Sequence, residues 1–471
     1  MTKQNEFRDV AQRALEHAVA WRTDGPKLPA IPPATRDQLR ARFDIGLPEK
    51  GLAGTEVIEA LVSAAQDGLA TNTHSNFYSW VQGSSHPVGV AADILTSAWG
   101  QNAAIYQTAP AAAIAEEIAA KWLLELLHLP AECSLAFSTG ATMASFICLS
   151  AARSEVLRQA GYDLEQNGLS GAPAVTVLLG DEAHATIFAD LKYLGFGERN
   201  LVRIAVDDQG RMLAADLAKK LALVAGPKIV ITQAGHINSG AFDPFPEIIA
   251  ASKLAGAWVH VDGAFGLWAR AVPTLAPMAA GLEAADSWTT DGHKWLQVPY
   301  DSGFAIVRHA EAHRRAMDVT ASYLTKHADD GRNPSHFGPE LSRRSRGFAV
   351  WAVLQALGRQ GVQEMVARHC RCAQHLAQRL RDVAGIRVLN QVVLNQLAIA
   401  FGEESESAEI RAQLTASVIQ AIREENLNFV LGANWRNQPI LRISVISLYT
   451  DIPDMDILAD SILRAWKAVR S

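Results

Sequence analysis

The sequence predicts an α/β fold in which a mostly parallel sheet is covered by helices on both faces. Helix-length segments separate several short apolar runs in the middle of the chain, notably at 212–225 and 246–255. Strands that alternate with helices in this way are typical of parallel sheets. The runs that we expect to be buried strands are 174–179, 228–233, 257–261, 284–288 and 303–308.

The chain before this alternation is expected to be helical. Residues 1–22 carry charged residues among apolar ones at helical spacing, which indicates an amphipathic helix rather than a signal peptide. Residues 1–90 contain Pro-rich connections and no apparent core of their own. A strong helix follows at 109–127, with Pro110 at its start and Pro130 beyond its end.

The last third of the chain has a different pattern, in which long helices mix with strands. The expected helices are 345–357, 363–383, 407–424 and 453–469, and the expected strands are 386–389, 396–401, 429–431 and 440–445. We therefore expect three parts: an N-terminal helical segment (1–90), a large domain (91–345) and a small C-terminal α+β domain (346–471).

Composition limits the class of protein. The chain has 471 residues, of which 49% are hydrophobic and 20% charged, as in soluble globular proteins. Its formal net charge of -6 gives no basic footprint for nucleic acid, and no apolar run of about 18 residues suggests a membrane span. Four cysteines without metal-ligand spacing indicate a reducing compartment, so we expect a cytoplasmic protein without a metal site.

The segment 287–295, Ser-Trp-Thr-Thr-Asp-Gly-His-Lys-Trp, carries the strongest chemical signal. Lys294 follows an expected strand and a Thr-Thr-Asp-Gly turn, in which Asp291 is expected to serve as a turn residue. A lysine buried at a strand end is costly unless its amine is neutralised or used. An imine with a carbonyl cofactor, usually pyridoxal phosphate, does both. An ordinary surface His-Lys pair is the alternative for this motif alone.

Three further motifs lie at expected strand ends, where open α/β sheets bind their ligands. The small residues at 138–142 precede a helix whose N-terminus favours an anion such as phosphate. His184 is placed to lie flat on a planar ring, and Asp262 is placed to face a pyridine nitrogen and keep it protonated. Each motif has a plain structural alternative, but together with Lys294 they predict a pyridoxal-phosphate site.

With these residues in view, the chain resembles the group II pyridoxal-phosphate-dependent amino-acid decarboxylases, which include the aromatic-amino-acid and glutamate decarboxylases. The resemblance covers nearly the whole chain. It implies the pyridoxal-phosphate-dependent transferase fold type I, with a mostly parallel seven-stranded sheet in the large domain. The motifs that carry it are Gly140-Ala141-Thr142, Asp181 with His184, 235–243, His260-Val261-Asp262, 291–295 and 299–303.

The resemblance also implies roles for these residues. Lys294 would form the internal aldimine with pyridoxal 5'-phosphate, and Asp262 would pair with the pyridine nitrogen. His184 would stack on one face of the ring, with Ala264 against the other. The remaining implied contacts, which hold the phosphate, are Gly140, Ala141, Thr142 and His293. Relatives in this family are dimers with the active site at the subunit interface, so we expect a homodimer in which residues 1–90 wrap around the partner.

The implied reaction is decarboxylation of an L-amino acid to an amine and CO2 through a quinonoid intermediate. The bond to be broken must stand perpendicular to the conjugated plane, so the protein selects the reaction by orienting the α-carboxylate. Trp80 and Gln82 match a segment that lines the substrate pocket in aromatic-specific relatives, and they favour an apolar or aromatic side chain. Arg442 is a candidate ligand for a carboxylate, with a salt bridge inside the small domain as the alternative.

Two departures from the family pattern affect the choice of reaction. The family commonly presents a proton-donating tyrosine on the loop ahead of an Arg-Arg pair. Here the pair is Arg343-Arg344, and the loop 331–338 ahead of it contains no tyrosine. Tyr323 resembles a different family tyrosine, at the start of the loop. His336 is therefore the expected acid, since its ordinary pKa of about 6.5 suits proton transfer near neutrality; a solvated loop histidine is the alternative.

His236 is the second departure, because it stands where many relatives carry threonine. We expect it to contact the cofactor's ring oxygen or the substrate carboxylate, with a packed structural histidine as the alternative. The missing loop tyrosine also leaves two other reactions open on the same site: an aldolase-type carbon–carbon lyase and a decarboxylating aldehyde synthase. A non-catalytic interaction protein that keeps the fold is the third possibility.

Overall fold

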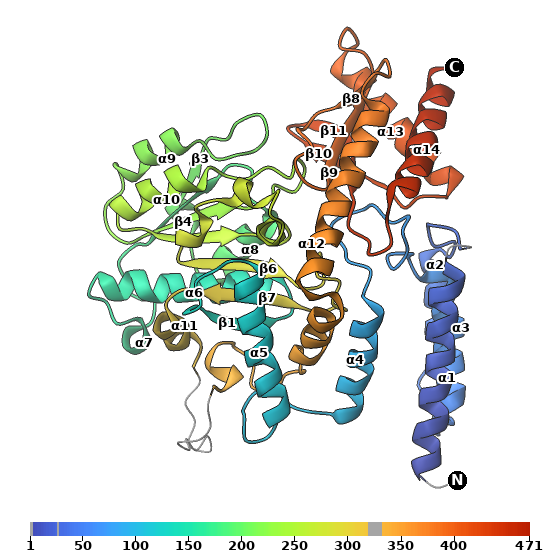
Figure 1. Cartoon of the computed structure of the whole chain (residues 1–471), viewed down its shortest axis with the longest axis horizontal. Coiled ribbons are helices and arrows are strands. Elements are labelled where there is room, and N and C mark those ends of the chain that lie inside the picture. The colour runs from blue at the N-terminus through green and yellow to red at the C-terminus, as the bar shows by residue number, and fades with distance from the viewer. Residues whose placement is uncertain (1–2, 26–27, 319–331) are drawn as a thin grey trace.

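Two sheets organise the chain, which the computed structural model describes over residues 3–25, 28–318 and 332–471. Figure 1 shows the larger sheet among its helices and the smaller sheet near the C-terminus. The long helix α12 (Gly347–Leu380) runs between the two and packs against elements of both parts. The division into parts at residues 90 and 345 stays a prediction.

The larger sheet has seven strands in the order β1-β7-β6-β5-β4-β2-β3. Only β7 runs antiparallel to its neighbours, so the predicted mostly parallel seven-stranded α/β sheet is confirmed. The strands are β1 (Ser134–Ser138), β2 (Thr176–Gly180), β3 (Leu201–Ile204), β4 (Lys228–Gln233), β5 (Trp258–Asp262), β6 (Ser287–Asp291) and β7 (Gly303–Val307).

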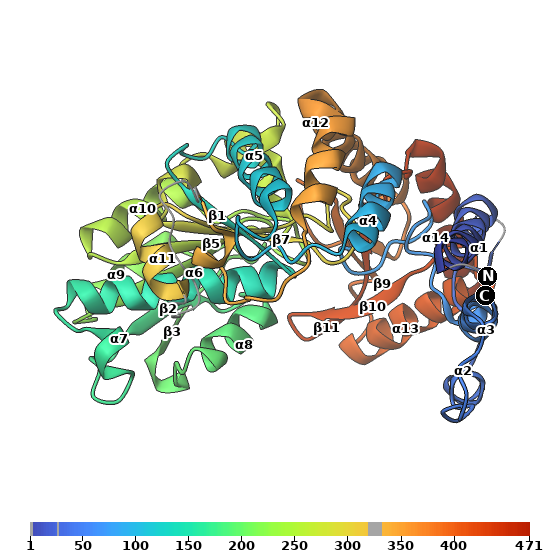
Figure 2. The ribbon, with the colours of Figure 1, turned by 90° about the horizontal axis from the view of Figure 1, so that it is seen from below.

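Helices cover both faces of this sheet because its strands are apolar on both sides. In β2, Val177 and Leu179 pack into one core cluster and Leu178 into another, as the alternation of side chains along a strand requires. Figure 2 shows helices on both sides of the strands. One face packs against α6 (Ala141–Gln159), α8 (Ala185–Tyr193) and α11 (Ala310–Met317), and the other against α5 (Pro110–Leu126), α9 (Ala214–Leu221) and α10 (Phe245–Leu254).

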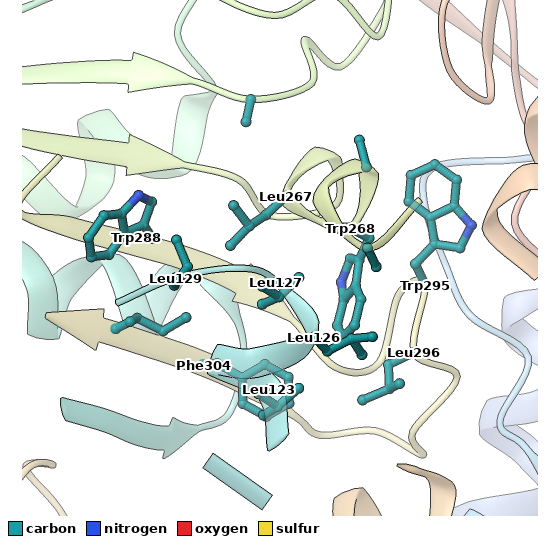
Figure 3. Close-up of a cluster of buried hydrophobic side chains, with 14 of the residues drawn as sticks. Leu123, Leu126, Leu127, Leu129, Leu267, Trp268, Trp288, Trp295, Leu296 and Phe304 are labelled. Atoms are coloured by element: carbon teal, nitrogen blue, oxygen red, sulfur yellow. The ribbon is translucent and has the colours of Figure 1, made fainter. Parts of the chain in front are cut away.

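The largest core cluster lies on the α5 face, close to the ends of β6 and β7. Figure 3 shows leucines of α5 and of the segment that follows it in one cluster with Trp268 and Trp288. Trp295, one residue after Lys294, is fully buried in the same cluster. The chain that follows β6 is therefore anchored by a large apolar side chain, which burial stabilises by roughly 2–3 kcal/mol.

The smaller sheet is antiparallel, in the order β10-β11-β9-β8. Its strands are β8 (Ile386–Val388), β9 (Gln396–Phe401), β10 (Leu431–Trp435) and β11 (Gln438–Ser444). One continuous apolar cluster joins it to α12, α13 (Ala408–Glu425) and α14 (Ile452–Arg470).

The N-terminal helices bury little of their surface. In α2 (Arg36–Phe43) no residue is buried, and in α3 (Gly54–Ala65) only Ala64 is. Helix α1 (Lys3–Asp24) packs on α3, and Figure 1 shows both standing apart from the large sheet. The remaining helices are α4 (Pro87–Trp99) and α7 (Leu164–Asn167). Across the described residues, no helix combines the length and apolarity that crossing a membrane requires.

Several strand predictions need correction. Strand β6 begins at Ser287 rather than 284, because 282–284 forms a 3-10 turn, and it continues through the residues that we expected to form a turn. Strand β10 lies later than the predicted 429–431. We predicted neither β1 nor β3, which are short and carry polar residues: serines at both ends of β1, and Arg203 in β3.

Candidate active site

The candidate site forms where the parallel strands end. Strand β5 ends at Asp262 and β6 ends at Asp291, while His184 lies four residues beyond the end of β2. The register pairs Asp262 with Thr289 on one side and with Gln233 on the other. The carboxyl edge of the sheet therefore brings the predicted groups together, as expected for an open α/β sheet.

Lys294 is held by an acid that we expected only to form a turn. Its Nζ lies 2.8 Å from Asp291 Oδ2, and the Lys294 side chain is 21% exposed. The other carboxylate oxygen, Oδ1, accepts a hydrogen bond of 2.6 Å from the backbone N–H of Ala141. Asp291 is thus a buried site residue that links Lys294 to the start of α6.

The backbone of Asp291 is fixed on both sides. Its N–H donates to the carbonyl of Ala264 at 2.9 Å, and its own carbonyl accepts from Trp268 Nε1 at 3.1 Å. Pairing with Gly303 across the antiparallel β6–β7 ladder adds further constraint. The sequence signal that we missed is the continuation of β6 through two threonines, a residue type that strands favour.

His184 and Asp262 occupy neighbouring positions deeper in the site. The imidazole Nδ1 of His184 accepts a hydrogen bond from the Thr186 N–H and so caps α8. Burial lowers the pKa of His184, and the charges of Lys294 and Arg442 lower it further, while the Asp262 carboxylate opposes them. A small cavity lies beside them; its lining includes His184, Ile187, Gln233 and Asp262.

Asp262 is buried, and its Oδ1 accepts a hydrogen bond of 3.1 Å from the N–H of Ala264. Ala264 therefore contacts both acids of the site, because its carbonyl also accepts the backbone N–H of Asp291 at 2.9 Å. This one residue fixes the spacing between the ends of β5 and β6.

His293 lies between Lys294 and the start of α6. Its Nε2 is 3.5 Å from Asp291 Oδ1, and its Nδ1 accepts a hydrogen bond of 3.1 Å from the Ser302 N–H. The ring stacks on Tyr300 with 4.3 Å between centroids. Burial lowers the pKa of His293, so the uncharged imidazole is favoured despite the nearby Asp291.

The turn before α6 is shaped to receive an anion. Gly140 precedes the helix, and a Cβ added at Gly303 would lie 2.4 Å from the Gly140 Cα. The Thr142 side chain is exposed, and the Ala141 N–H already binds a carboxylate, that of Asp291. This N–H is therefore occupied, and the N–H groups of the following residues in the first turn of α6 are the ones that fit the phosphate of a cofactor.

The segment at 77–84 passes directly beside Lys294. The N–H of Gly83 donates to the carbonyl of His293 at 3.1 Å, and a Cβ at Gly83 would meet the Lys294 carbonyl at 2.4 Å. Gln82 is partly buried and Trp80 is 50% exposed. By contrast, Phe77 and Tyr78 are buried core residues.

His236 and Arg442 lie on the side of the site that faces the small sheet. His236 is buried, with Nε2 3.2 Å from Glu182 Oε2 and Nδ1 3.2 Å from Ser239 Oγ. Arg442, on β11, contacts Asn238 Oδ1 at 3.4 Å. The contacts predicted for these two residues with cofactor or substrate stay predictions.

His336 lies in a short 3-10 turn, Pro334–His336, that packs near the C-terminal end of α11. Its Nε2 lies 4.0 Å from Asp318 Oδ1, and its ring meets that of Phe337 edge-on. Its predicted role as an acid stays a prediction. Tyr323, at the start of the loop, lies outside the described residues.

Known proteins resemble the chain in both sequence and fold. A profile described as "Pyridoxal-dependent decarboxylase conserved domain" matches residues 37–401. Over 462 residues, the chain is 24% identical to an aromatic-L-amino-acid decarboxylase of Bacillus atrophaeus, covering 96% of this chain and 93% of the relative. It is also 24% identical over 444 residues to the mouse (Mus musculus) acidic amino acid decarboxylase GADL1, and this match covers 90% of this chain and 80% of the mouse protein.

Among solved structures, the fold resembles that of the rice (Oryza sativa) protein TDC, crystallised with PLP and tryptamine. The TM-score is 0.93 at 20% sequence identity, and the match covers 100% of this chain and 99% of that one. This likeness extends over both sheets and the N-terminal helices.

Proposed function

The chain belongs to the family of pyridoxal-dependent decarboxylases, and on this premise we propose that it decarboxylates an L-amino acid with an apolar or aromatic side chain. The products would be the amine and CO2. The observation that carries the proposal is the convergence of Lys294, Asp262 and His184 at the carboxyl edge of the sheet. A lysine that forms an imine and an acid at the ring nitrogen are the groups that pyridoxal phosphate uses, and the imidazole would lie against the ring.

The cofactor, when bound, supplies a protonated conjugated ring that draws electrons from the α-carbon of the substrate. Lys294 would hold it covalently through Nζ, and Asp262 would hold a proton at the ring nitrogen. His184 would lie against one ring face; its lowered pKa favours the neutral form, which avoids a second positive charge beside the ring. Ala264 would pack on the other face. The turn Gly140-Ala141-Thr142 and His293 would receive the phosphate.

Trp80 and Gln82 support the preference for an apolar or aromatic substrate. The backbone N–H of Gly83 donates a hydrogen bond to the carbonyl of His293, so the side chains of Trp80 and Gln82 belong to a segment that passes beside the proposed anchor lysine. Arg442 would offer a charge to a carboxylate, and its guanidinium is close enough to His184 to lower the pKa of that imidazole. The two relatives named above act on aromatic and on acidic amino acids, and the exposed Trp80 is our reason for favouring the first class.

We further propose that His336 returns a proton to the α-carbon, because imidazole is a suitable acid near neutrality.

We propose a homodimer in which α1–α4 contact the partner. Apolar residues on these helices are exposed in one chain, among them Phe7, Leu61 and Trp99. The four cysteines are free and buried, which supports our proposal of a cytoplasmic location.

The decisive experiment is a panel of carboxyl-labelled amino acids followed by mass spectrometry of the products. We expect labelled CO2 and the corresponding amine from aromatic substrates. An aldehyde with ammonia and peroxide would indicate the aldehyde synthase instead, and an aldehyde with glycine would indicate the aldolase-type lyase. If the carboxyl label stays in solution with every substrate, decarboxylation is wrong.

A separate measurement tests Lys294. The cofactor-loaded protein should absorb visible light through its lysine-bound chromophore, and Lys294→Ala should lose this band and at least about 10³-fold of kcat. Lys253→Ala, in the last turn of α10, is the matched control and should retain both.

A further inference from the structure

Gln297, three residues after Lys294, is a polar side chain that lies completely buried. Its backbone has a φ of 61°, in the left-handed region that residues other than glycine rarely adopt. A conformation of this kind is costly, and it persists only where the surrounding structure imposes it. The contacts around Gln297 must therefore hold it in place.

The side chain of Gln297 joins the turn that carries Lys294 to two distant segments. Its Oε1 accepts hydrogen bonds from the N–H of Ser84 at 2.7 Å and from the Ser84 hydroxyl at 3.1 Å. Its Nε2 donates to the carbonyl of Ile446 at 2.7 Å. The backbone N–H of Gln297 donates to the carbonyl of Lys294 at 3.2 Å and so closes the turn.

Both distant segments carry residues that we propose to contact the substrate. Ser84 follows Trp80 and Gln82 by a few residues in the segment that passes beside the turn. Ile446 lies two residues beyond the end of β11, which carries Arg442. One carboxamide therefore ties the anchor lysine to both groups of candidate substrate residues.

The partner of Gln297 in the first segment is itself fixed. The Ser84 hydroxyl accepts a hydrogen bond of 2.8 Å from the N–H of Leu448. Arg22, in the last turn of α1, donates to the carbonyls of Ser84 and Ser85 at 2.8 and 2.9 Å. Ser84 is thus held from the small domain and from the N-terminal helix, so it gives Gln297 a rigid anchor.

We propose that Gln297 is a positioning residue that sets where Lys294 stands relative to the residues that receive the substrate. It acts through the main chain of the Lys294 turn and not by contact with the reacting atoms. The inference rests on the proposed role of Lys294 as the cofactor anchor, and it goes beyond that role by naming the contact that fixes the anchor.

The chemistry of a carboxamide explains why glutamine serves here. The N–H of Ser84 needs an acceptor and the carbonyl of Ile446 needs a donor, and a carboxamide offers both at one end of the side chain. A carboxylate or an apolar side chain of the same length leaves at least one of these buried groups without its partner, which is costly.

The first test measures how fast Lys294 forms its bond to pyridoxal 5'-phosphate. The cofactor is removed from the full chain and added back, and the growth of the visible absorbance band is followed. Gln297→Asn keeps a carboxamide and a residue type that tolerates positive φ, but its reach is one methylene shorter. We expect bond formation to slow by about tenfold or more, because a displacement of about 1 Å can cost about 100-fold.

The matched control is Gln396→Asn, the same change at another buried glutamine. Gln396 on β9 is also completely buried, and its Oε1 accepts the Ser444 hydroxyl at 2.6 Å. This variant loses a comparable contact away from the Lys294 turn, so it should form the bond at the wild-type rate.

The second test needs no cofactor and follows amide hydrogen exchange. In Gln297→Asn, exchange at residues 83–86 and 292–297 should become about tenfold faster, because the contact that closes the two segments on each other is lost. In Gln396→Asn, exchange at these residues should match that of the wild type.

A wild-type rate of bond formation in Gln297→Asn would overturn the proposal, as would equal slowing in Gln396→Asn. If Gln297→Asn does not fold, Ser84→Ala replaces it, since it removes the hydroxyl bond to Oε1 and leaves Gln297 itself; a wild-type rate there would equally overturn the proposal. A failure of the proposed function is distinct: the wild type would show no Lys294-dependent band, and unchanged exchange in Gln297→Asn would then refute the tether by itself.

Discussion

At the scale of single residues, Asp190 is the buried acid that the proposed chemistry leaves unused. It lies on α8, one turn after the cavity-lining Ile187, and both of its carboxyl oxygens lack a hydrogen-bond partner among the described residues. Burial raises its pKa to about 8, and the charge of Asp262 contributes. Asp190 is therefore protonated at neutral pH, although an unfolded chain would ionise it near pH 4.

This shift predicts a pH-dependent cost to stability. The pKa of Asp190 is higher in the folded than in the unfolded chain. Its contribution to the free energy of unfolding is therefore fully present below about pH 4 and is lost as the pH rises through about 8. The free energy of unfolding of Asp190→Asn, measured with urea, should therefore exceed that of wild type by an amount that grows over this interval. The exposed Asp382→Asn is the control and should give a constant difference within about 0.5 kcal/mol. A constant difference for Asp190→Asn as well would contradict the assignment.

At the scale of elements, the β10–β11 hairpin joins the small sheet to the active-site side of the large one. Its turn is Arg436-Asn437, and both residues have the positive φ of a two-residue hairpin turn. Arg436 Nε and Trp435 Nε1 donate to the two oxygens of Glu182 at 2.7 and 2.8 Å, and His236 contacts the same carboxylate. Glu182 lies two residues before His184, so this link also supports the site.

Glu182 should therefore be important for docking of the hairpin. Burial alone would raise its pKa, but hydrogen bonds from His236, Trp435 and Arg436 together lower it to about 2. Its contribution to stability is present above about pH 4 and is lost as the pH falls through about 2. At neutral pH, Glu182→Gln should lose roughly 2 kcal/mol of unfolding free energy and amide-exchange protection in β10 and β11. Glu125→Gln, which breaks the exposed pair with Arg359, should lose less than about 1 kcal/mol.

Helix α12 contains a break that the sequence indicated and the structure explains. We predicted two helices, 345–357 and 363–383; the structure has a continuous element with Gly358 at φ 59° and ψ -177° inside it. Other residue types rarely adopt this conformation. The predicted gap was wider than the actual break, because the helix resumes directly after the glycine.

Gly358→Ala should destabilise the protein by about 1–3 kcal/mol. A Cβ there would meet nothing within 4 Å, so the loss would come from the backbone alone. The matched control is Gly361→Ala, three residues later at an ordinary helical φ, where the added Cβ would lie 3.2 Å from Leu357 Cβ. It should change stability by less than about 1 kcal/mol. Equal losses in the two variants would show that the conformation at Gly358 is not the cause.

At the scale of the whole molecule, the N-terminal helices reach beyond the core of one chain. Figure 1 shows α1 and α3 beside each other on the side away from α9 and α10. Leu61 on α3 is 53% exposed and lies one helical turn after the exposed Val57, so the two form part of an apolar stripe. A single chain leaves this stripe in water, which supports the proposed dimer.

Leu61→Glu should therefore weaken the dimer, and light scattering after gel filtration should show an increased monomer fraction at micromolar concentration. A charge placed in an apolar interface costs several kcal/mol of association free energy. Leu254→Glu is the control: this residue ends α10 and is 92% exposed, and Figure 1 shows α10 on the side of the molecule away from α3. An unchanged mass for Leu61→Glu would place the interface elsewhere.

The sequence by itself determined the cofactor, the family and the mostly parallel sheet. Each of these depends on local signals: an apolar run predicts a buried strand, and Lys294, Asp262 and His184 lie directly at or just beyond the ends of such runs. The carboxyl ends of parallel strands meet at one edge, so a correct assignment of strands is enough to bring these residues together.

The tertiary structure alone decided what surrounds them. Asp291 became a site residue because β6 continues against β7 and because α6 approaches from 150 positions away to donate the Ala141 N–H. Glu182 bonds to Trp435 across 253 positions, a link that no local pattern encodes. Both contacts form only when distant segments pack together, which is why the sequence predicts the chemistry of the site while the fold determines the partners that hold its charges.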